Sequence, residues 1–329
     1  MPKPKLAVAA LGGTVSMQAR QDQAGVMPSL SGEALLDSVP GLSQLADVYV
    51  ETLCLVPSAS LTFEDLLRVL EWAQAQVNEG ASGVIVTQGT DSLEETAFFL
   101  DLLWKNEAPL VVTGAMRPAT QAGADGPANL MAAANVAISY NSRRRGVLVV
   151  MNDEIHDPRR VRKADSLATH AFASPITGPL GLLIEGRAVY TTSCCERLTL
   201  PVPYLQNHQV ALLEAVFSDA PLLLDQVLTL DYSGLIVAGF GAGHVSASWA
   251  DSIGKLTRVM PVIIASRTGS GSTARTTYGF EGGELDLISR GALMSGMLCP
   301  RKARILLWLL IGCGRQDDLN DWLEHALWD

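Results

Sequence analysis

Short apolar runs alternate with longer amphipathic segments along much of the chain. The short runs are bounded by glycine or proline and hold few polar residues. This pattern is typical of strands that are covered on both faces of a sheet. We expect such strands at residues 6–11, 83–87, 109–113, 146–151, 234–239 and 261–266.

Longer segments between these runs are expected to be helices. Thr62 is suited to cap a helix over residues 64–79, in which the apolar residues form one broad stripe. Strands that alternate with helices predict an α/β fold with a doubly wound, mostly parallel sheet. A proline suits the first turn of a helix, which predicts further helices at 129–138 after Pro127 and at 302–310 after Pro300.

The chain of 329 residues is longer than a typical single domain of ~100–200 residues, which favours two domains. Residues 190–209 break the alternation of strands and helices, since they contain prolines and have no clear period. We predict that this segment is a linker. It would join a larger N-terminal domain at residues 1–189 to a smaller C-terminal α/β domain at residues 210–329.

Composition and charge exclude several classes of protein. Hydrophobic residues make up 48% of the chain and charged residues 18%, so it can bury a sizeable core and is not disordered. A formal net charge of −10 gives no electrostatic reason to bind nucleic acid. The five cysteines are scattered and include no CxxC pair, so we expect reduced thiols and no metal site.

No apolar run is long enough to place the protein in a membrane. The run at residues 305–311 is far shorter than the ~20 residues that span a bilayer. The run at 6–11 is shorter than the ~7–15 residues of a signal-peptide core. We therefore expect a cytoplasmic protein that does not bind membranes.

Small and polar residues stand at the ends of the first three expected strands. Ligands bind at the carboxyl ends of the strands in a doubly wound sheet. Glycines there allow tight turns and close backbone approach, and amides at helix starts can stabilise a negative oxygen, as acyl chemistry requires. The motifs are Gly12-Gly13-Thr14, Thr87-Gln88-Gly89-Thr90-Asp91 and Gly114-Ala115-Met116-Arg117-Pro118.

Each motif also has a purely structural interpretation. Gly-Gly-Thr after a strand is often only a tight turn. Thr90 could cap a helix that has acidic residues in its first turn. Lys163 lies in the charge run 159–163, which is typical of a solvated loop. The glycine-rich stretches 239–243 and 269–271 do not complete a phosphate-binding pattern. The histidines His156, His170 and His244 lack metal-ligand spacing.

Taken together, these motifs resemble the bacterial-type L-asparaginase family, whose members are tetrameric amidohydrolases with a threonine nucleophile. Residues 11–15 match the first signature of that family, and residues 87–96 match the second almost residue by residue. The resemblance covers nearly the whole chain. Further similar stretches are 114–118 with 125–129, the segment 162–166 that corresponds to the one with the catalytic lysine, and the closing helix at 300–304.

The resemblance implies a catalytic role for four residues. Thr14 would attack the side-chain amide carbon of the substrate, and Thr90, Asp91 and Lys163 would form a second polar cluster. A threonine hydroxyl needs a neighbouring base and an oxyanion site. A lysine that loses its proton could be that base through Thr90. Which threonine attacks first is left open.

The resemblance also implies a set of substrate-binding residues. Ser58 matches the serine that holds the α-carboxylate, and Ser60 is close enough to compete for that role. Asp91 is the natural partner of the α-ammonium group. Amides for the oxyanion are expected at the turns from Gly13 to Thr14 and from Gly89 to Thr90.

Two further substrate-binding residues are expected. Ala115 belongs to the third strand-end motif. Glu284, found by counting back without gaps from Lys302, corresponds to an acidic residue that is contributed across the dimer interface.

The chain departs from the family pattern in its lid, which we expect at residues 15–28. Residues 15–48 contain no tyrosine, although the family usually has one soon after the first threonine. Without this tyrosine, we expect the lid to close loosely over the substrate. A loosely closed lid should raise the Michaelis constant for asparagine to the order of millimolar. Ala242 stands where family members often have asparagine, so substrate preference is affected more than reaction class.

We therefore expect an L-asparaginase that converts asparagine and water to aspartate and ammonia through a threonine acyl-enzyme, without metal or cofactor. A homotetramer made of two dimers is implied by the resemblance. One alternative is a glutaminase-asparaginase of broader specificity. Another is a non-catalytic amino-acid-binding protein on the same scaffold, which would have no use for Thr14, Thr90 and Lys163 together. An amidase subunit of a tRNA-dependent amidotransferase would need an extra N-terminal domain.

Overall fold

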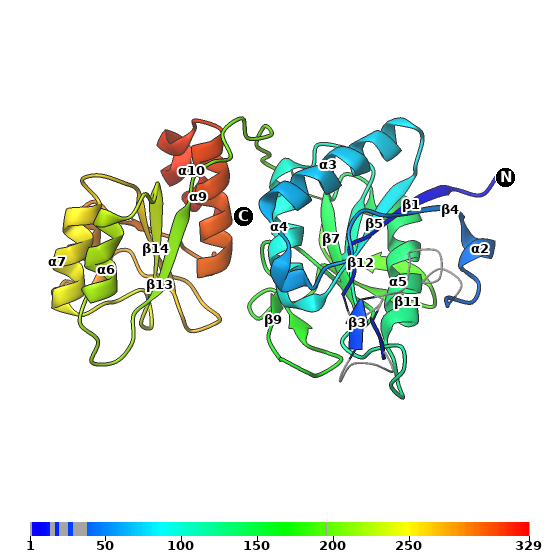
Figure 1. Ribbon diagram of the computed structural model, residues 1–329, viewed down its shortest axis with the longest axis horizontal. Coiled ribbons are helices and arrows are strands. Elements are labelled where there is room, and N and C mark those ends of the chain that lie inside the picture. The colour runs from blue at the N-terminus through cyan, green and yellow to red at the C-terminus, as the bar shows by residue number, and fades with distance from the viewer. Residues whose placement is uncertain (1, 14–16, 20–25, 29–37, 195, 329) are drawn as a thin grey trace. The chain divides into compact units, whose positions relative to one another are not determined.

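The computed structural model describes residues 2–13, 17–19, 26–28, 38–194 and 196–328. The chain divides into two compact units, Met1–Thr199 and Leu200–Asp329 (Figure 1). The division falls within the segment expected to be a linker, and the exact domain limits stay a prediction.

An eight-stranded sheet forms the centre of the described part of the N-terminal unit, in the order β12-β11-β8-β7-β6-β5-β1-β4. The strands from β4 to β7 run parallel, whereas β8, β11 and β12 are antiparallel to their neighbours. The strands are β1 (Lys5–Ala10), β4 (Asp47–Thr52), β5 (Gly83–Thr87), β6 (Leu110–Thr113), β7 (Val147–Met151), β8 (Glu154–His156), β11 (Gly181–Ile184) and β12 (Arg187–Tyr190).

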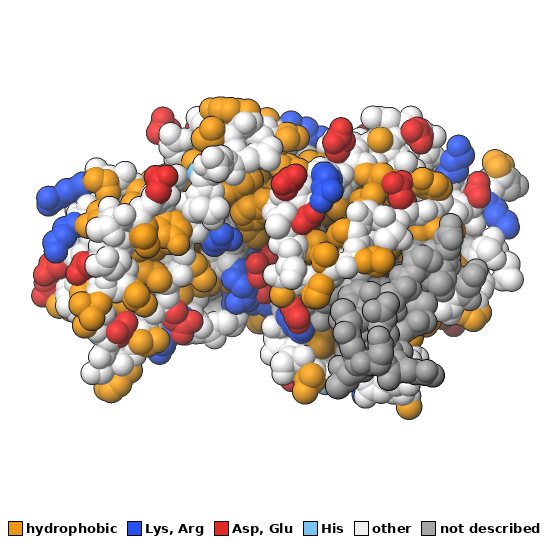
Figure 2. Space-filling view, in the orientation of Figure 1, with side chains coloured by type: hydrophobic (Ala, Val, Ile, Leu, Met, Phe, Trp, Pro, Cys, Tyr) orange, Lys and Arg blue, Asp and Glu red, His pale blue; other side chains and the backbone are white. Residues whose placement is uncertain are grey.

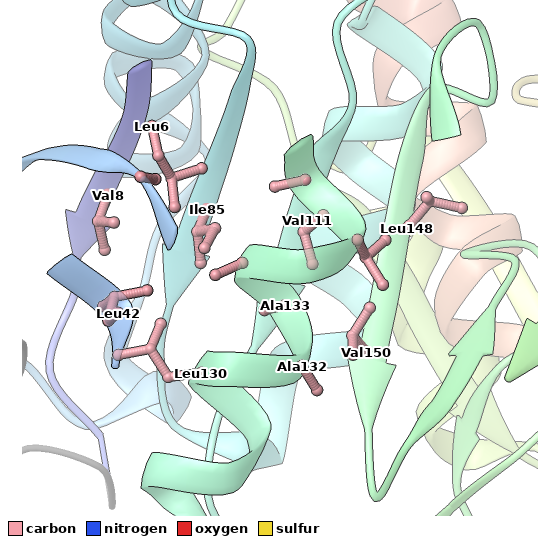
Figure 3. Packing of buried hydrophobic residues seen from close by; sticks show 14 of the residues in the cluster. Leu6, Val8, Leu42, Ile85, Val111, Leu130, Ala132, Ala133, Leu148 and Val150 are labelled. Atoms are coloured by element: carbon pink, nitrogen blue, oxygen red, sulfur yellow. The ribbon is translucent and has the colours of Figure 1, made fainter. Parts of the chain in front are cut away.

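Helices cover both faces of this sheet. On one face, α5 (Gly126–Ile138) and the short α2 (Leu42–Leu45) pack their apolar side chains onto the strands. Figure 3 shows Leu130 of α5 and Leu42 of α2 beside the strand residue Val8. On the other face, α3 (Phe63–Asn78) and α4 (Leu93–Leu103) contact β1, β5, β6 and β7 (Figure 1). The expected doubly wound, mostly parallel sheet is confirmed.

The C-terminal unit contains a four-stranded parallel sheet in the order β13-β14-β15-β16. Apolar residues of α7 pack on one face, and α9 contacts β13, β14 and β15. The strands are β13 (Val210–Glu214), β14 (Gly234–Gly239), β15 (Val262–Ser266) and β16 (Leu293–Met294). The helices are α6 (Leu222–Gln226), α7 (Ala247–Leu256), α8 (Glu284–Ser289), α9 (Pro300–Gly312) and α10 (Leu319–Trp328).

Several element ends follow from local signals, as expected. Thr62 caps α3 reciprocally: its hydroxyl accepts a hydrogen bond from the Asp65 amide, and the Asp65 carboxylate accepts one from the Thr62 amide. Pro127 and Pro300 lie in the first turns of α5 and α9. Both prolines lack an N–H group, which the first turn of a helix leaves unpaired in any case.

Two short ribbons lie outside the main sheets. β2 (Met17–Ala19) pairs antiparallel with β3 (Val26–Pro28), and both belong to the segment expected to be a lid. Residues 14–16 and 20–25 of that segment lie outside the described residues. The second ribbon, of β9 (Arg162–Lys163) and β10 (Phe172–Ala173), carries a residue of the candidate site.

The surface carries exposed apolar side chains among its charged ones, as the face in Figure 2 shows. In the C-terminal unit, Phe217 is 90% exposed and Leu222 and Leu223 are each 71% exposed. None of the helices in the described residues has both the length and the apolar character needed to cross a membrane.

Candidate active site

The loops that follow β1, β5 and β6 lie at one edge of the N-terminal sheet. β5 lies between β1 and β6, and the three strands are parallel, so their carboxyl ends meet at this edge. The loops contain Gly12 and Gly13, residues 88–91 and residues 114–117. Thr14, the expected nucleophile, lies outside the described residues.

The backbone at Gly13 packs directly against Gly89. A β-carbon at Gly13 would lie only 2.0 Å from the Gly89 nitrogen, and the φ angle there is +84°. Gly12 has a φ of +94°, and a β-carbon there would lie 2.8 Å from the carbonyl oxygen of Val56. Residues with a side chain rarely adopt such angles, so only glycine allows the first loop to approach the second this closely.

Lys163 joins the side chains of two consecutive residues in the second loop. Its Nζ donates hydrogen bonds to Thr90 Oγ1 at 3.0 Å and to Asp91 Oδ1 at 2.6 Å. Thr90 is buried and the Lys163 side chain is only 15% exposed, whereas the Asp91 side chain is 71% exposed. The structure thus brings together three of the residues that the resemblance placed in one polar cluster.

The β9–β10 ribbon positions Lys163. Lys163 lies opposite the buried residue Phe172 in the antiparallel pairing, and the Ala164 amide donates to the Ala171 carbonyl oxygen at 2.6 Å. Just beyond β10, Ser174 Oγ lies 3.1 Å from Nδ1 of the buried His156, the last residue of β8. The interpretation of the charge run as a solvated loop is therefore wrong for Lys163.

Thr90 is not a helix cap. The chain forms a short 3-10 turn, η3 (Thr90–Ser92), whose N-cap is Gly89, and then enters α4, whose N-cap is Ser92. Neither cap residue makes a side-chain capping hydrogen bond. The Thr90 hydroxyl oxygen instead accepts the hydrogen bond from Lys163.

Ser58 lies against the second loop. Ser58 begins the turn η2 (Ser58–Ser60), is buried, and accepts a hydrogen bond from the Asp91 amide at 3.2 Å. Ser92 Oγ donates to the Ser58 carbonyl oxygen at 2.7 Å. Ser60 is exposed. Ser92, which the sequence reasoning did not identify, thus helps to hold Ser58 against the second loop.

Asp125 and Asn129 hold the loop after β6. The Asp125 carboxylate accepts hydrogen bonds from the backbone amides of residues 116 and 117, at 3.0 and 2.8 Å. Asn129 Nδ2 donates to the Gly114 carbonyl oxygen at 3.0 Å and to Asp125 Oδ2 at 3.1 Å. Ala115 lies between these anchored groups and is fully buried. The sequence reasoning quoted this stretch but gave Asp125 and Asn129 no role.

Glu284 belongs to the C-terminal unit, where its carboxylate already has partners. It is fully buried and accepts hydrogen bonds from the backbone amides of Thr277 and Tyr278, both at 2.6 Å. His244 Nε2 lies 3.3 Å from its second oxygen. Burial alone would raise the pKa of Glu284, but the backbone amides and His244 together hold it below its usual value. Donation of Glu284 to a neighbouring subunit stays a prediction.

The glycine-rich loop that contains Ala242 is held in place by hydrogen bonds. The carbonyl oxygen of Ala242, in the glycine-rich loop after β14, accepts a hydrogen bond from the Ala274 amide at 2.9 Å. In that loop, the Gly241 carbonyl oxygen accepts from Ser266 Oγ at 2.6 Å.

No group of three or more His, Cys, Asp or Glu residues in the described part of the chain is arranged to hold a metal ion.

Two family descriptions match nearly the whole chain. Residues 5–194 match the family described as asparaginase, N-terminal, and residues 209–321 match the glutaminase/asparaginase C-terminal domain.

Relatives are similar over most of their length. A probable periplasmic L-asparaginase of Haemophilus influenzae is 35% identical over 317 residues, which cover 94% of this chain and 88% of that protein. L-asparaginase 2 of Escherichia coli is 31% identical, with 94% and 89% covered. The glutaminase-asparaginase of Pseudomonas fluorescens biotype A is 32% identical, with 99% and 91% covered. The crystal structure of a probable cytoplasmic L-asparaginase from Campylobacter jejuni has a TM-score of 0.87 at 28% identity, with 98% and 99% covered.

Proposed function

The chain belongs to the asparaginase family, and on that premise we propose that it is an L-asparaginase, which hydrolyses L-asparagine to L-aspartate and ammonia. One observation carries this proposal: Lys163, Thr90 and Asp91 form a hydrogen-bonded cluster at the strand edge where the Gly13 backbone packs against Gly89. A binding protein without catalysis would not need a lysine bonded to a buried threonine hydroxyl at this edge.

In the proposed reaction, the Thr14 hydroxyl oxygen attacks the carboxamide carbon of the substrate, and its proton is taken up by a base. The resulting tetrahedral oxyanion is stabilised by backbone amides at the Gly13 and Gly89 turns. The carbon–nitrogen bond breaks as the nitrogen gains a proton, which releases ammonia and leaves an aspartyl ester on Thr14. Water then attacks this ester, which releases aspartate and restores the hydroxyl.

Lys163 and Thr90 are the proposed proton-transfer pair. The 3.0 Å contact between Lys163 Nζ and Thr90 Oγ1 is short enough for a proton to move between the two atoms. When its amine is neutral, Lys163 takes the proton of the Thr90 hydroxyl, and Thr90 in turn accepts one from the attacking group. In the second half of the reaction the same pair activates the water.

Ser58 and Asp91 are proposed to recognise the amino-acid part of the substrate. The exposed Asp91 carboxylate can pair with an α-ammonium group. The Ser58 hydroxyl, which accepts from the Asp91 amide, keeps its own proton for the α-carboxylate. Both residues lie beside Thr90, so they would hold the substrate's carboxamide close to the reacting groups.

Glutamine is the alternative substrate, because the relatives include glutaminase-asparaginases as well as L-asparaginases. The test is ammonia release from purified protein with L-asparagine, L-glutamine or no substrate, in the presence and absence of a metal chelator. We expect asparagine to be preferred and the chelator to have no effect. Equal rates with glutamine would favour the broader specificity. Saturable binding of asparagine without ammonia release would favour the non-catalytic alternative.

A homotetramer with Glu284 shared between subunits is the proposed assembly. The exposed residues Phe217, Leu222 and Leu223 supply apolar surface of the kind that subunit contacts bury. Light scattering measures the mass directly, and a particle of 35.0 kDa with full activity would contradict the assembly.

Subunit mixing tests the sharing of Glu284. Lys163→Met and Glu284→Gln subunits would each be inactive alone, and a mixed dimer would contain one intact site if Glu284 is donated to the partner. If the mixture does not regain activity, Glu284 acts only within its own subunit, where it holds its own loop.

Cytoplasmic location stays a prediction, since one relative is described as periplasmic and another as cytoplasmic.

A further inference from the structure

We propose that His156 is a positioning residue for Lys163, because its hydrogen bond with Ser174 closes the loop that presents the lysine amine to Thr90. The inference rests on the proposed function, in which Lys163 and Thr90 transfer the proton. It adds a residue that lies outside the three strand-edge loops and acts on the reaction through the backbone.

The loop that carries Lys163 begins and ends at this pair of residues. His156 is the last residue of β8 and Ser174 directly follows β10, so residues 157–173 form an excursion from the main sheet between them. Ser174 Oγ and His156 Nδ1 are 3.1 Å apart, and both residues are buried. The contact therefore joins the two ends of the loop across 18 positions of the sequence.

The other supports of this loop are short. β9 and β10 pair over two residues each, and a two-stranded ribbon is marginal on its own. At the start of the loop, the Asp157 carbonyl oxygen accepts a hydrogen bond from the Val161 amide at 2.9 Å. At its end, the Ser174 carbonyl oxygen accepts one from the Gly178 amide, also at 2.9 Å. These bonds fix each end separately, whereas the contact with His156 ties the ends to each other.

Glu154 decides which nitrogen of His156 carries the proton. Residues two apart on a strand project from the same face, and His156 Nε2 lies 3.2 Å from Glu154 Oε2. An ionised carboxylate can only accept hydrogen bonds, so the neutral imidazole keeps its proton on Nε2. Nδ1 then accepts the hydrogen bond of the Ser174 hydroxyl. Glu154 and His156 together thus hold Ser174 in one orientation.

Serine, histidine and glutamate in this order resemble a nucleophile, a base and an orienting acid. Ser174 is only 6% exposed and His156 is 0% exposed, however, so a substrate has no access to the serine hydroxyl. The role of the three residues is therefore to hold the loop and not to form a second catalytic centre.

The position of Ser174 is passed on to Lys163 through the ribbon. Ser174 lies two residues after the buried Phe172, and Phe172 lies opposite Lys163 in the antiparallel pairing. A shift at the base of the loop would therefore move Lys163 Nζ relative to Thr90 Oγ1, from which it now lies 3.0 Å away. Proton transfer needs a donor and an acceptor within hydrogen-bond reach, so such a shift slows the reaction.

The experiment compares two replacements of His156 that each keep one end of the imidazole. The side-chain amide of Asn reaches the position of Nδ1, and that of Gln reaches the position of Nε2. His156→Asn should therefore keep the bond with Ser174 and a rate near that of the wild type. His156→Gln should lose about tenfold in kcat for asparagine, less than the ~10²-fold that a misplacement of about 1 Å can cost. KM should change much less, because Ser58 and Asp91 lie on other loops.

Ser174→Ala removes the same hydrogen bond from its other side and should lower kcat by the same factor. This variant decides the matter if His156→Gln does not fold by circular dichroism. His170→Gln and Ser166→Ala are the matched controls, since both residues are exposed and lie in the same loop. Both control variants should keep the wild-type rate.

Combination with Lys163→Met separates positioning from general damage to the fold. A residue that acts through Lys163 has nothing to position once the amine is gone, so His156→Gln should not lower the residual rate of Lys163→Met further. A further loss of about tenfold in that background, or a His156→Asn protein no faster than His156→Gln, would overturn the inference but not the proposed function. A Lys163→Met protein with the wild-type rate would overturn the inference together with the proposed proton-transfer pair.

Discussion

Lys163 donates a hydrogen bond of 3.0 Å to the hydroxyl of Thr90, a residue that lies 73 positions earlier in the chain. The lysine comes from the β9–β10 ribbon and the threonine from the turn after β5. Because both side chains are largely buried, their contact is shielded from water and has a defined geometry. The hydrogen bond between Lys163 and Thr90 is therefore the first contact to test by mutation.

Replacement of Lys163 by Met should lower kcat for asparagine by ~10²-fold or more, since it removes the proposed base while keeping the length of the side chain. Lys255→Met, at an exposed position in the last turn of α7, is the matched control and should keep the wild-type rate. Steady-state ammonia release measures both variants. A Lys163→Met enzyme that keeps more than half of the wild-type rate would remove the lysine from the mechanism.

The covalent intermediate should form on Thr14. Rapid acid quenching during turnover, followed by peptide mass spectrometry, should find an aspartyl adduct on the peptide that contains Thr14 and none on the peptide that contains Thr90. Thr14→Ala and Thr90→Ala should each lose ~10²-fold or more in kcat, because one supplies the nucleophile and the other the proton path. An adduct on Thr90 would exchange the two assignments.

Ser58→Ala should raise the Michaelis constant for asparagine about tenfold or more, the effect of removing a hydrogen bond to a charged group, with a smaller change in kcat. Ser60→Ala should change neither constant, since Ser60 is exposed and Ser58 alone reaches the second loop. Kinetics on the two single variants separate the alternatives. A larger effect from Ser60 would reverse the assignment that the structure favours.

Gly13→Ala should inactivate the enzyme, because its new β-carbon would meet the Gly89 nitrogen and displace the catalytic loop. A misplacement of about 1 Å can cost ~10²-fold in rate. Gly80→Ala is the control for backbone strain alone. Gly80 has a φ of +98°, but a β-carbon there would meet nothing within 4 Å. Thermal unfolding should show a loss of ~1–2 kcal/mol for Gly80→Ala with full activity. Full activity in Gly13→Ala would contradict the close packing.

Tyr190 should make the N-terminal unit less stable at high pH. Burial raises its pKa to about 12, against the opposing effects of the Ser142 hydrogen bond and the Arg145 guanidinium. In the unfolded chain the Tyr190 hydroxyl ionises near its ordinary pKa of 10.0, whereas in the folded chain it stays protonated to about pH 12. Stability from this group is therefore fully present below pH 10 and is lost as the pH rises towards 12.

Tyr190→Phe tests this pH dependence. The variant lacks the ionising hydroxyl, so the difference in free energy of unfolding between wild type and variant should shrink as the pH rises above 10. Tyr140→Phe is the control, since Tyr140 is 85% exposed. Urea unfolding at several pH values from 9 to 11 gives the comparison. A constant difference between wild type and Tyr190→Phe would show that the buried hydroxyl does not titrate as described.

The strands that could be predicted from sequence are those buried on both faces. β5 and β14 have the expected bounds, because both are continuous apolar runs that end in glycine or a polar residue. β4, β8, β11, β12 and β13 were not predicted. Of these, β4 lies at the edge of its sheet with residues that are half-buried or exposed, so no continuous apolar run marks it.

The candidate site could be predicted only in part, for a different reason. Thr90 and Asp91 follow a strong strand signal, so their place at the strand edge is local information. The contact of Thr90 with Lys163 depends on how the β9–β10 ribbon folds back, which no local pattern contains, and it came from the resemblance to a family. Asp125 and Asn129 were missed because a polar side chain that binds backbone groups has no local sequence signal that separates it from a solvent-exposed one.

The parallel pairing of β1, β5 and β6 also has a consequence for how the enzyme refolds. Each pairing joins strands that are separated by a crossover helix or a long connection, and such non-local pairings are slow to form. Helices such as α3 depend on local hydrogen bonds and can appear much earlier. The candidate active site is complete only after the chain has folded through β10, because the β9–β10 ribbon supplies Lys163. In a refolding time course, ammonia release should therefore return later than the helical circular dichroism signal, so that activity reports completion of the sheet rather than collapse of the chain.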